Sequence, residues 1–289
     1  MTRVGMAALR QRLVQFSSAL AANAWLQGWV EKGIYTGPLK VACFPGLQCY
    51  SCPSSIASCP LGSLQSLLAS PGISLGSIGS TEPLTVLAIL GSILFVGFLA
   101  GRFACSHLCP FGLLQDLLYM IPAPRLRLPP GLRNARFAVL AVFAVSLPLL
   151  LRPGPGMPGD PWFCKAVCPA GTVTGGWPFA LWDSGGTLET GFLFAWKSAV
   201  AVLVILWSVT TSRPFCRTLC PLGAAWGLAG RVSLFRMTVD RSCIRCGKCR
   251  EVCPVDIEIW KDPSSSTCIR CGRCVPACPV AAVKNGLAK

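Results

Sequence analysis

The sequence predicts a mainly α-helical membrane protein, with about four transmembrane helices followed by a small, cysteine-rich α+β domain at the C-terminus. Three observations lead to this prediction. The mean hydropathy is +0.58 and only 13% of the 289 residues are charged, which is too apolar for a typical soluble domain. Long stretches between residues 13 and 209 carry almost no charge, and eight of the eighteen cysteines fall after residue 242. We therefore predict a membrane domain over residues 1–236 and a separate domain over residues 237–289.

Four segments are candidates for crossing the bilayer. Residues 84–104 and 192–209 have roughly the 20-residue length that a hydrocarbon core of about 30 Å requires. Residues 137–151 are fewer and include Pro148, so this segment spans only if its flanks contribute or the bilayer thins. Residues 13–30 are the most interrupted by polar side chains, and we expect a retained anchor there because no signal-peptide cleavage site is evident.

Basic residues set the expected orientation. Arginines crowd the N-terminus, residues 102–136 and residues 213–236, whereas residues 31–83 and 152–191 hold few basic residues. Because basic flanks stay on the cytoplasmic side, we expect a multi-pass protein of the cytoplasmic membrane with both termini in the cytoplasm. The net charge is +15, but the basic residues cluster beside the apolar stretches and no motif that reads a nucleic-acid groove accompanies them. Nucleic acid is therefore not an expected partner.

Two runs in the C-terminal domain, residues 243–254 and 268–279, share the spacing C-x2-C-x2-C-x3-C-P. Three thiolates on one tight loop can bind one face of an iron–sulfur cube, and the fourth cysteine then reaches the neighbouring cube. The spacing therefore predicts two [4Fe–4S] clusters. Structural zinc is the alternative, but it leaves the third cysteine and the C-x3-C-P tail unexplained. The expected ligands are Cys243, Cys246, Cys249 and Cys278 for one cluster and Cys253, Cys268, Cys271 and Cys274 for the other.

A second motif, C-P-x-G, occurs four times in the membrane part, at residues 59–62, 109–112, 168–171 and 220–223. In the last three copies, another cysteine lies four residues before the cysteine of the motif. Proline suits the first turn of a helix because its missing N–H has no partner there. We therefore expect each motif cysteine at a helix N-terminus, where the helix dipole favours the thiolate that iron needs.

The predicted topology brings two of these motifs to the cytoplasmic face, because they follow the second and fourth spans. Together they supply Cys105, Cys109, Cys216 and Cys220. We expect a third iron–sulfur cluster at these residues. Free thiols or an interfacial zinc ion are the alternatives.

The other two motifs are expected at the outer face. A fourth cluster there would use Cys164 and Cys168 with two of Cys49, Cys52 and Cys59. Disulfides are the alternative, because the outer compartment is oxidising. Clusters on opposite faces would be separated by a core of about 30 Å, too far for one fast electron-transfer step. A quinone, a flavin or clusters set deeper than the interface would then be needed.

The sequence resembles a known family of membrane-bound iron–sulfur proteins. Residues 102–116 (RFACSHLCPFGLLQD) and 213–223 (RPFCRTLCPLG), followed by the two C-terminal runs, are similar to membrane-bound polyferredoxins of the NapH/MauN type. They are also similar to the C-terminal part of NosR-like proteins and to CcoG proteins. The resemblance covers roughly residues 84–289, and the cysteines at positions 43–59, 164 and 168 go beyond the minimal NapH pattern.

The resemblance implies a membrane-bound electron-transfer protein. It would pass electrons between the quinone pool or an extracytoplasmic redox partner and a cytoplasmic-side partner, which could be a soluble ferredoxin, a flavoprotein or a reductase subunit. Two other functions stay open: a quinol dehydrogenase in its own right, and a redox sensor or assembly factor for another metalloenzyme. For a bound quinone, the candidate residues are His107, between two motif cysteines, and Lys197, a charged residue within an apolar span. The alternatives are an interfacial histidine without such a role and a lysine that snorkels from the outer end of its span.

Overall fold

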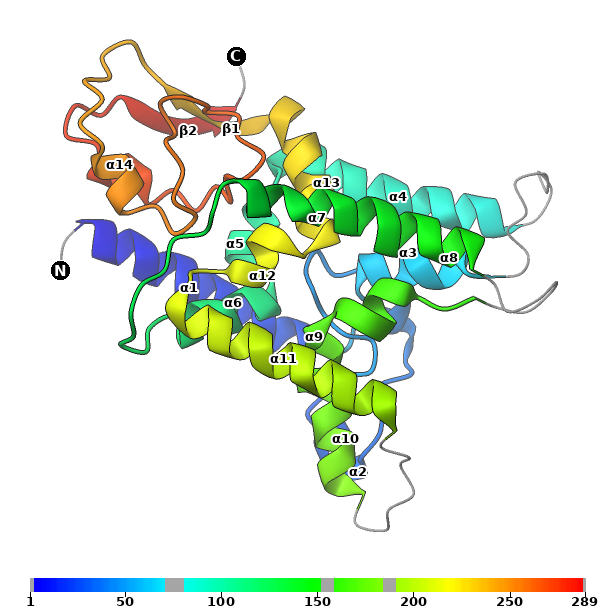
Figure 1. Cartoon of the computed structure of the whole chain (residues 1–289). Coiled ribbons are helices and arrows are strands. Elements are labelled where there is room, and N and C mark those ends of the chain that lie inside the picture. The colour runs from blue at the N-terminus through cyan, green and yellow to red at the C-terminus, as the bar shows by residue number, and fades with distance from the viewer. Residues whose placement is uncertain (1–2, 71–80, 152–158, 184–190, 288–289) are drawn as a thin grey trace.

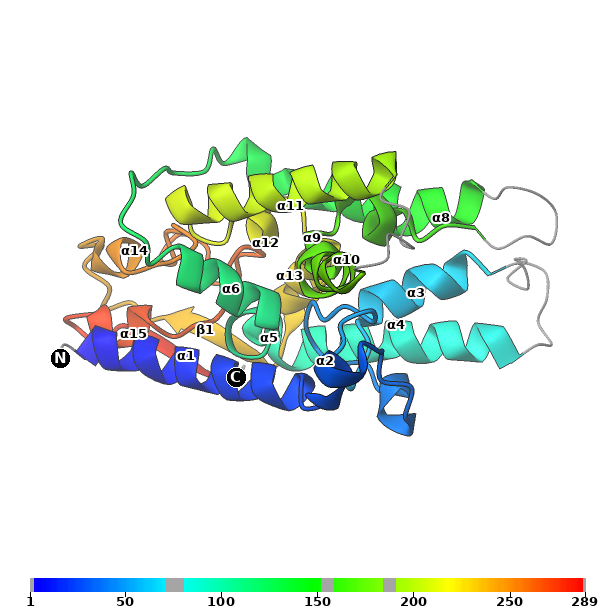
Figure 2. The ribbon, with the colours of Figure 1, turned by 90° about the horizontal axis from the view of Figure 1, so that it is seen from below.

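The computed structural model describes residues 3–70, 81–151, 159–183 and 191–287. Long helices surround a core of short ones, and the C-terminal domain sits at one end of them (Figure 1). The long helices run in a roughly common direction (Figure 2). The fold is mainly helical, with one small sheet in the C-terminal domain.

Two helices in the described part of the chain are long and apolar enough to cross a bilayer. They are the helical run Gly131–Leu150 and α11 (Phe192–Thr210), which match the expected segments 137–151 and 192–209. The run 131–150 contains a π-helical part just before Pro148, because proline lacks the N–H that the preceding turn would need. Its parts are η2 (Gly131–Asn134), α7 (Ala135–Val139), η3 (Leu140–Ser146) and α8 (Leu147–Leu150).

The segment expected over residues 84–104 is shorter than predicted. The helix is α4 (Thr81–Ala100), and its apolar stretch is Leu84–Ala100. The helix stops because Gly101 has φ +54°, a left-handed conformation that suits glycine. A side chain at this position would also collide with the guanidinium of Arg270, only 2.5 Å from an added Cβ.

The prediction of one spanning helix over residues 13–30 is wrong. The chain instead forms α1 (Arg3–Ala22) and the separate short helix α2 (Gln27–Glu31). Gln11 and Gln15 are buried on α1 because their amides donate to backbone carbonyls of the segment after α4, at 2.9 and 2.8 Å. Helix α1 therefore packs on the protein through polar contacts, and lies beside the C-terminal domain (Figure 1).

Each C-P-x-G motif begins a short helix, as predicted. The proline occupies the first turn and the motif cysteine precedes it in an extended conformation. The four motif helices are α3 (Pro60–Leu68), α6 (Pro110–Leu118), α9 (Pro169–Gly171) and α13 (Pro221–Ala229). Helix α3 packs on α4, α6 on α1 and α11, α9 on α11, and α13 on α4 and α7. The motif helices therefore form the interior, and the long helices cover them.

Shorter elements complete the helical part of the molecule. The remaining α-helices are α5 (Phe103–His107), α10 (Trp177–Trp182) and α12 (Pro214–Thr218). Single helical turns of other types occur at η1 (Pro38–Val41), η4 (Phe163–Val167), η5 (Thr172–Gly176) and η6 (Gly230–Val232).

The outer surface of the long helices is apolar. Leu87 and Phe95 on α4 are 65% and 63% exposed, and Leu203 and Leu206 on α11 are 65% and 59% exposed. Large apolar side chains in contiguous exposed positions mark a surface that meets lipid or a partner. Together with the two membrane-length helices, this surface agrees with a membrane location.

The C-terminal domain is built on a two-stranded antiparallel sheet. Strand β1 (Phe235–Val239) pairs with β2 (Val283–Leu287), with Phe235 opposite Leu287 and Val239 opposite Val283. Its two short helices are α14 (Lys248–Glu251) and α15 (Cys274–Ala277). Met237, Val255, Ile257 and Ile269 fill the space between the sheet and the cysteine loops. Helix α15 packs against α1, which joins the domain to the rest of the helices.

Candidate metal-cluster sites

The two cysteine runs of the C-terminal domain form two groups of four. In each group, the fourth cysteine of one run lies with the first three of the other. The first C-terminal quartet lines one cavity with Cys243, Cys246, Cys249 and Cys278, and the second C-terminal quartet lines another with Cys253, Cys268, Cys271 and Cys274. Cys249 also borders the cavity of the second quartet, so the two groups adjoin. This is the crossed arrangement that the spacing implies.

The backbone of both runs curls in the same way. Arg245 and Arg270, at equivalent positions of the two runs, have φ of 55° and 54°, and Gly247 and Gly272 also have positive φ. A residue in the left-handed conformation between right-handed ones turns successive N–H groups inward, which makes an anion-binding concavity. The loops are therefore shaped for a group that carries negative charge.

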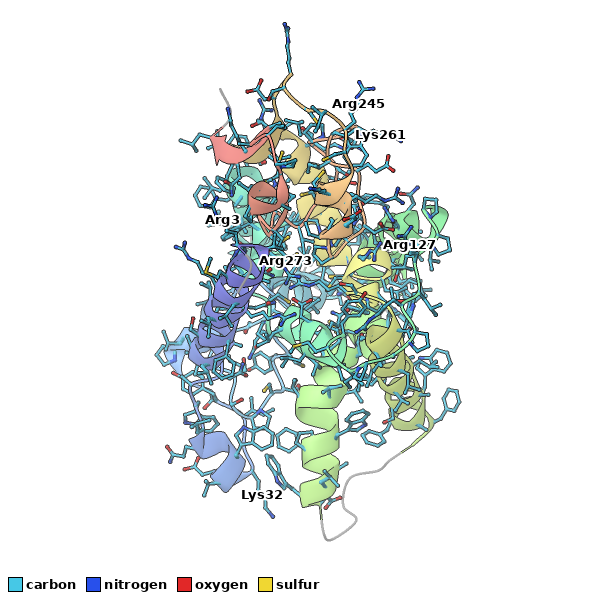
Figure 3. The ribbon with its side chains drawn as sticks, turned by 90° about the vertical axis from the view of Figure 1, so that its left-hand side faces the viewer. Arg3, Lys32, Arg127, Arg245, Lys261 and Arg273 are labelled. Carbon is cyan, nitrogen blue, oxygen red and sulfur yellow. The ribbon has the colours of Figure 1, made fainter. Side chains whose placement is uncertain are left out.

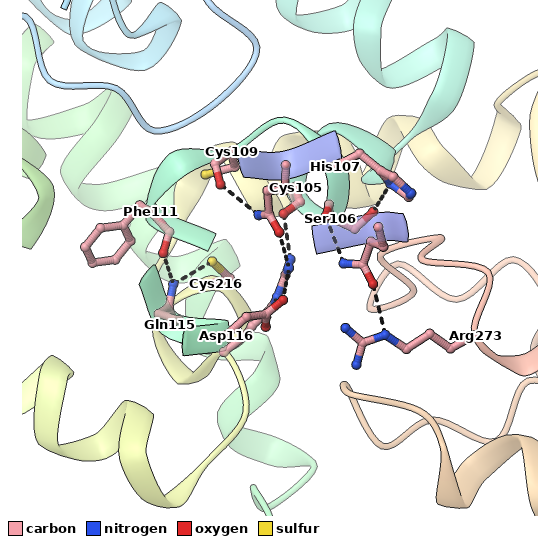
Figure 4. A network of polar contacts seen from close by, with 12 residues as sticks. Cys105, Ser106, His107, Cys109, Phe111, Gln115, Asp116, Cys216 and Arg273 are labelled. Atoms are coloured by element: carbon pink, nitrogen blue, oxygen red, sulfur yellow. Dashed lines mark hydrogen bonds and ion pairs between the residues drawn. The ribbon is translucent and has the colours of Figure 1, made fainter. Parts of the chain in front are cut away.

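A third group of four cysteines lies where α4 and α11 end. Cys105, Cys109, Cys216 and Cys220, called the inner quartet below, are only 3–6% exposed, and their thiols interact electrostatically with one another. Burial, together with the neighbouring thiols, raises the pKa of Cys216 to about 12. Binding of a metal at such a site would displace the thiol protons. Figure 4 shows three of the four cysteines in one polar network.

Two arginines tie the halves of the inner quartet together reciprocally. Arg213 donates from Nη1 to the carbonyl of Cys105 at 2.6 Å, and Arg102 donates from Nη2 to the carbonyl of Cys216 at 2.7 Å. Each arginine stands three residues before the first cysteine of its own motif. The sequence analysis missed both residues, although their equal spacing in the two motifs was a usable signal.

Arg213 also forms the most buried ion pair of the described chain. Its Nε and Nη2 donate to the two carboxylate oxygens of Asp116 at 2.7 and 2.6 Å, and the side chains are 0% and 6% exposed. Nη2 also reaches Oε1 of Gln15 on α1 at 3.3 Å. A bidentate pair of this kind fixes geometry as well as charge, so Arg213 holds α1, α5 and α6 in register.

The glycine of the C-P-x-G motif is explained by close approach. A Cβ on Gly112 would lie 2.9 Å from the carbonyl oxygen of Cys105, and one on Gly223 would lie 3.2 Å from that of Cys216. On Gly171 it would lie 2.9 Å from Sγ of Cys49. In three of the four copies, the motif glycine therefore leaves room for the cysteines.

A fourth group of cysteines lines a cavity of about 510 Å³. Cys49, Cys59, Cys164 and Cys168, called the outer quartet below, all border it. The sequence left open which two of Cys49, Cys52 and Cys59 join the other pair, and the structure brings in Cys49 and Cys59.

The two remaining cysteines of the N-terminal set lie elsewhere. The thiol of Cys52 contacts Oδ1 of Asn23 and Oγ of Ser54, each at 3.4 Å. Cys43 is hydrogen-bonded to Ser63. Neither borders the cavity of the outer quartet. All eighteen cysteines are free thiols in the structure, so the disulfide alternative is not present in it.

Inner and outer quartets share one more feature, a glutamine six residues after a motif cysteine. Gln115 donates from Nε2 to Sγ of Cys216 at 3.0 Å, and Gln65 donates to Sγ of Cys164 at 3.7 Å. Both glutamines thus reach the first cysteine of the other motif in the same site. The extended pattern C-P-x-G-x2-Q therefore describes two copies of one architecture.

The inner and outer quartets are neighbours. Leu47 donates its N–H to Sγ of Cys109 at 3.4 Å and also lines the outer cavity, while Cys49 follows two residues later. Phe215, next to an inner cysteine, lies 6.3 Å from Phe163 of the outer cavity, measured between ring centroids. The two quartets are therefore not separated by a full membrane core, because the motif helices fold back into the interior. Sites deeper than the two faces were one of the expected alternatives.

Buried arginines with unused donors surround the inner quartet. Arg102 and Arg136 are each 1% exposed; Nε of both and Nη1 of Arg136 have no hydrogen-bond partner in the described part of the chain. Arg136 interacts electrostatically with Cys220 and Cys105. A buried cation without a partner is costly, and an iron–sulfur cluster with four thiolate ligands is an anion. The residues present therefore fit such a group.

Within the described ranges, no group of three or more His, Cys, Asp or Glu side chains is arranged to hold a single metal ion. The four thiolates of a cube bind four different irons, so they lie farther apart than the ligands of one ion. The ligand geometry expected for a single metal ion therefore does not apply to the quartets, and an iron–sulfur cluster is the group to test against them.

The two candidate quinone residues are not brought together. Lys197 lines the outer cavity, and His107 does not. The ring of His107 stacks on Phe103 at 3.9 Å, and its Nδ1 is 2.6 Å from Oγ of Ser106. Burial lowers the pKa of His107.

Comparisons with known proteins agree with three of the four quartets. A 4Fe-4S binding domain family matches residues 82–129 and 192–239, which contain the inner quartet. A second 4Fe-4S binding domain family matches residues 238–257 and 263–284, which contain both C-terminal quartets. The chain thus carries 4Fe-4S binding domains with cysteines for several clusters. The outer quartet lies outside the matched residues.

The chain has distant curated relatives, several of which are ferredoxin-type proteins. The chain is 28% identical over 201 residues to the methylamine utilization ferredoxin-type protein MauN of Methylobacillus flagellatus, covering 65% of this chain and 61% of MauN. It is 27% identical over 261 residues to the ferredoxin-type protein NapH of Haemophilus influenzae, covering 88% and 76%. It is 26% identical over 164 residues to the regulatory protein NosR of Stutzerimonas stutzeri, covering 54% and 20%. The match thus spans less than two thirds of MauN's own length. No solved structure matches the chain.

Proposed function

Because the chain is a distant relative of the 4Fe–4S ferredoxin-type proteins, we propose that it is a membrane-bound electron-transfer protein that holds four [4Fe–4S] clusters in a row. The observation that carries this proposal is the succession of four cysteine quartets, each adjoining the next. A bound [4Fe–4S] cluster supplies one-electron transfer. The chain's own residues bury the sites, balance their charge and keep them close together.

Contacts of the second C-terminal quartet support this succession. Arg102 donates from Nη1 to the carbonyl of Thr267 at 3.1 Å, directly before Cys268, while its Nη2 holds the carbonyl of Cys216. One side chain thus joins the second C-terminal quartet to the inner quartet. The first C-terminal quartet lies at the far side of its domain, where Cys246 is exposed. The order is first C-terminal, second C-terminal, inner and outer quartet.

The two ends of the row suit different partners. Exposed Arg241, Arg245 and Lys248 surround Cys246, which suits an acidic surface on a cytoplasmic-side ferredoxin, flavoprotein or reductase subunit. At the other end, the open cavity of the outer quartet suits exchange with the quinone pool or an extracytoplasmic redox partner. Its lining includes Lys197, a cation within a membrane-length helix, and such residues are usually functional.

The proposed orientation places the C-terminal domain in the cytoplasm. Arg245 and Lys261 lie at one end of the molecule and Lys32 at the other, and the labelled Arg3, Arg127 and Arg273 lie nearer the first end (Figure 3). Basic flanks favour the cytoplasmic side. A green fluorescent protein fused to the C-terminus should then fluoresce, and alkaline phosphatase fused there should be inactive; the opposite result would overturn the orientation.

Iron and acid-labile sulfide per chain test the four sites directly. Anaerobically purified protein should hold about sixteen irons, at four per cluster. The double variant Cys49→Ser with Cys168→Ser should hold about twelve. The matched control, Cys43→Ser with Cys52→Ser, should keep about sixteen, because neither thiol borders the outer cavity. Equal iron in both double variants would remove the outer site from the proposal, and about eight irons in the wild type would remove the inner site as well.

Turnover separates this proposal from its alternatives. A quinol dehydrogenase in its own right would oxidise a quinol analogue as the purified protein alone. An electron-transfer protein would do so only with its partner added. A redox sensor or assembly factor would transfer electrons far below catalytic rates in either case.

A further inference from the structure

A basic cavity of about 670 Å³ lies where the C-terminal domain meets the helices. Its walls come from α1, α6, the loop between α6 and η2, and the segment that leads to Cys253. Figure 3 shows two lining residues, Arg127 and Arg273, on one face below the domain. The electron-transfer role proposed above does not use this cavity. Six arginines line it: Arg12, Arg125, Arg127, Arg217, Arg250 and Arg273.

Arg217 is the most buried of these arginines. It is 2% exposed, and only its Nη1 has a partner, the carbonyl of Ser212 at 3.3 Å. Its Nε and Nη2 are buried without a hydrogen-bond partner in the described part of the chain. A guanidinium held in this way gains stability from an added anion.

The acidic groups of the cavity balance only part of its positive charge. Four carboxylates line it, and three of them already have ion pairs. These three are Asp116, Asp256 and Glu258, which pair with Arg213, Arg250 and Lys261, respectively. Within the described residues, five of the six arginines form no ion pair, namely Arg12, Arg125, Arg127, Arg217 and Arg273. The cavity therefore has a surplus of positive charge.

The neighbouring cysteine quartet balances only part of this charge. Cys253 is the single member of the second C-terminal quartet that borders the cavity, and it interacts electrostatically with Arg217. Arg273 interacts in the same way with Cys271, which lines the adjoining cluster cavity. Unused donors are also spread over three separate elements: Nε of Arg12 on α1, Nε and Nη2 of Arg217 on α12, and Nη2 of Arg273 beside α15. These nitrogens are themselves buried, but their guanidinium groups come from three separate elements that border one cavity, which favours an anionic ligand between them.

We propose that this cavity binds a phosphate-bearing anion through Arg12, Arg217 and Arg273. The planar guanidinium fork matches the oxygens of a phosphate, and several forks around one cavity favour that group over a carboxylate. The volume leaves room for more than the phosphate itself. Two sources share this chemistry: the headgroup of an anionic phospholipid from the adjacent leaflet, and a soluble phosphate ester. The ligand would lie against Cys253.

Binding to the iron-loaded protein tests the proposal. The protein is placed in nanodiscs of phosphatidylcholine and titrated with radiolabelled pyrophosphate; a parallel sample in nanodiscs with phosphatidylglycerol is examined by native mass spectrometry for retained lipid. We expect one phosphate-bearing ligand per chain in at least one arm. Arg217→Gln and Arg12→Gln should each weaken its binding about tenfold or more, as loss of one charge-assisted hydrogen bond predicts. Arg241→Gln, an exposed arginine of the same domain, is the matched control and should bind as the wild type does.

The two arms also identify the source. Retained phosphatidylglycerol that pyrophosphate does not displace assigns the site to a lipid headgroup, and tight pyrophosphate binding in phosphatidylcholine assigns it to a soluble ester. Iron per chain is measured for every variant. If Arg217→Gln loses iron, the proposal is tested by the Arg12→Gln variant, whose arginine is only half-buried. Absence of both ligands from the wild type, or equal binding by Arg12→Gln and Arg241→Gln, would overturn the proposal.

Discussion

The inner and outer quartets are built from the same repeated motif, but they balance charge in different ways. Around the inner quartet, Arg102 and Arg213 stand three residues before the first cysteine of each motif and hold the opposite half of the site. At the outer quartet the equivalent position before Cys164 is Pro161. The lysines of its cavity are Lys165 and Lys197, of which Lys165 pairs with a carboxylate outside the cavity. The inner site is closed by arginines, and the outer site opens into a cavity.

This difference suggests two tasks for one architecture. A buried site with fixed guanidinium groups needs little reorganisation when its charge changes, which suits a relay between two other sites. An open site has room for a partner molecule and exchanges its surroundings more easily. The duplication of C-P-x-G-x2-Q thus gives two cluster sites of similar construction, one for transfer within the protein and one for exchange at its end.

The largest expected difference concerns the ion pairs beside the two sites. Asp116→Asn leaves the guanidinium of Arg213 buried without its partner, which should cost about 3–5 kcal/mol of unfolding free energy. Asp160→Asn breaks the exposed pair with Lys165, whose side chains are 45% and 38% exposed, and should cost about 0–1 kcal/mol. Denaturant unfolding in detergent measures both. Equal losses would mean that the inner site does not depend on its arginine.

The inner ion pair also predicts a dependence on pH. Burial alone would raise the pKa of Asp116, but the ion pair with Arg213 outweighs burial, so the pKa lies below its ordinary value of 3.8. The stabilisation is therefore fully present above about pH 3.8 and is lost as the pH falls through the lower pKa of the folded state. Unfolding measured along an acid series should show this loss in the wild type and not in Asp116→Asn.

Substitution of the motif glycines should have an effect of intermediate size that differs between the inner and the outer quartet. Gly112→Ala places a Cβ 2.9 Å from the carbonyl of Cys105, whereas Gly62→Ala places one 3.7 Å from Sγ of Cys164, an ordinary contact. Overpacking of the first kind costs about 1–3 kcal/mol, and alanine otherwise favours a helix by about 1 kcal/mol. Gly112→Ala should lose about four irons per chain, one cluster, and Gly62→Ala should lose none. Retention of all irons by Gly112→Ala would mean that the inner motif tolerates a side chain.

What the sequence could predict depended on how far apart the cooperating residues lie. Both C-terminal quartets and the inner quartet follow from short spacings and from the ends of two helices, so local patterns were enough. The choice of Cys49 over Cys52 depends on contact between the loop at residues 47–49 and Gly171, more than a hundred residues away. No local pattern carries that information. Hydropathy also failed for residues 13–30, because it does not register that Gln11 and Gln15 find buried carbonyl partners.

The smallest expected effect comes from the glutamine that both sites share. Gln115 is 3.0 Å from Sγ of Cys216 and Gln65 is 3.7 Å from Sγ of Cys164. A hydrogen bond to a cluster sulfur stabilises the more negative, reduced state and so raises the reduction potential. One bond of about 1 kcal/mol corresponds to about 40 mV for one electron, given about 59 mV per tenfold change. Gln115→Leu should lower one potential by about that amount in an EPR-monitored titration, and Gln65→Leu should lower another by less because its contact is longer. A shift of the same potential by both variants would contradict two separate sites, since each glutamine contacts a cysteine of a different quartet.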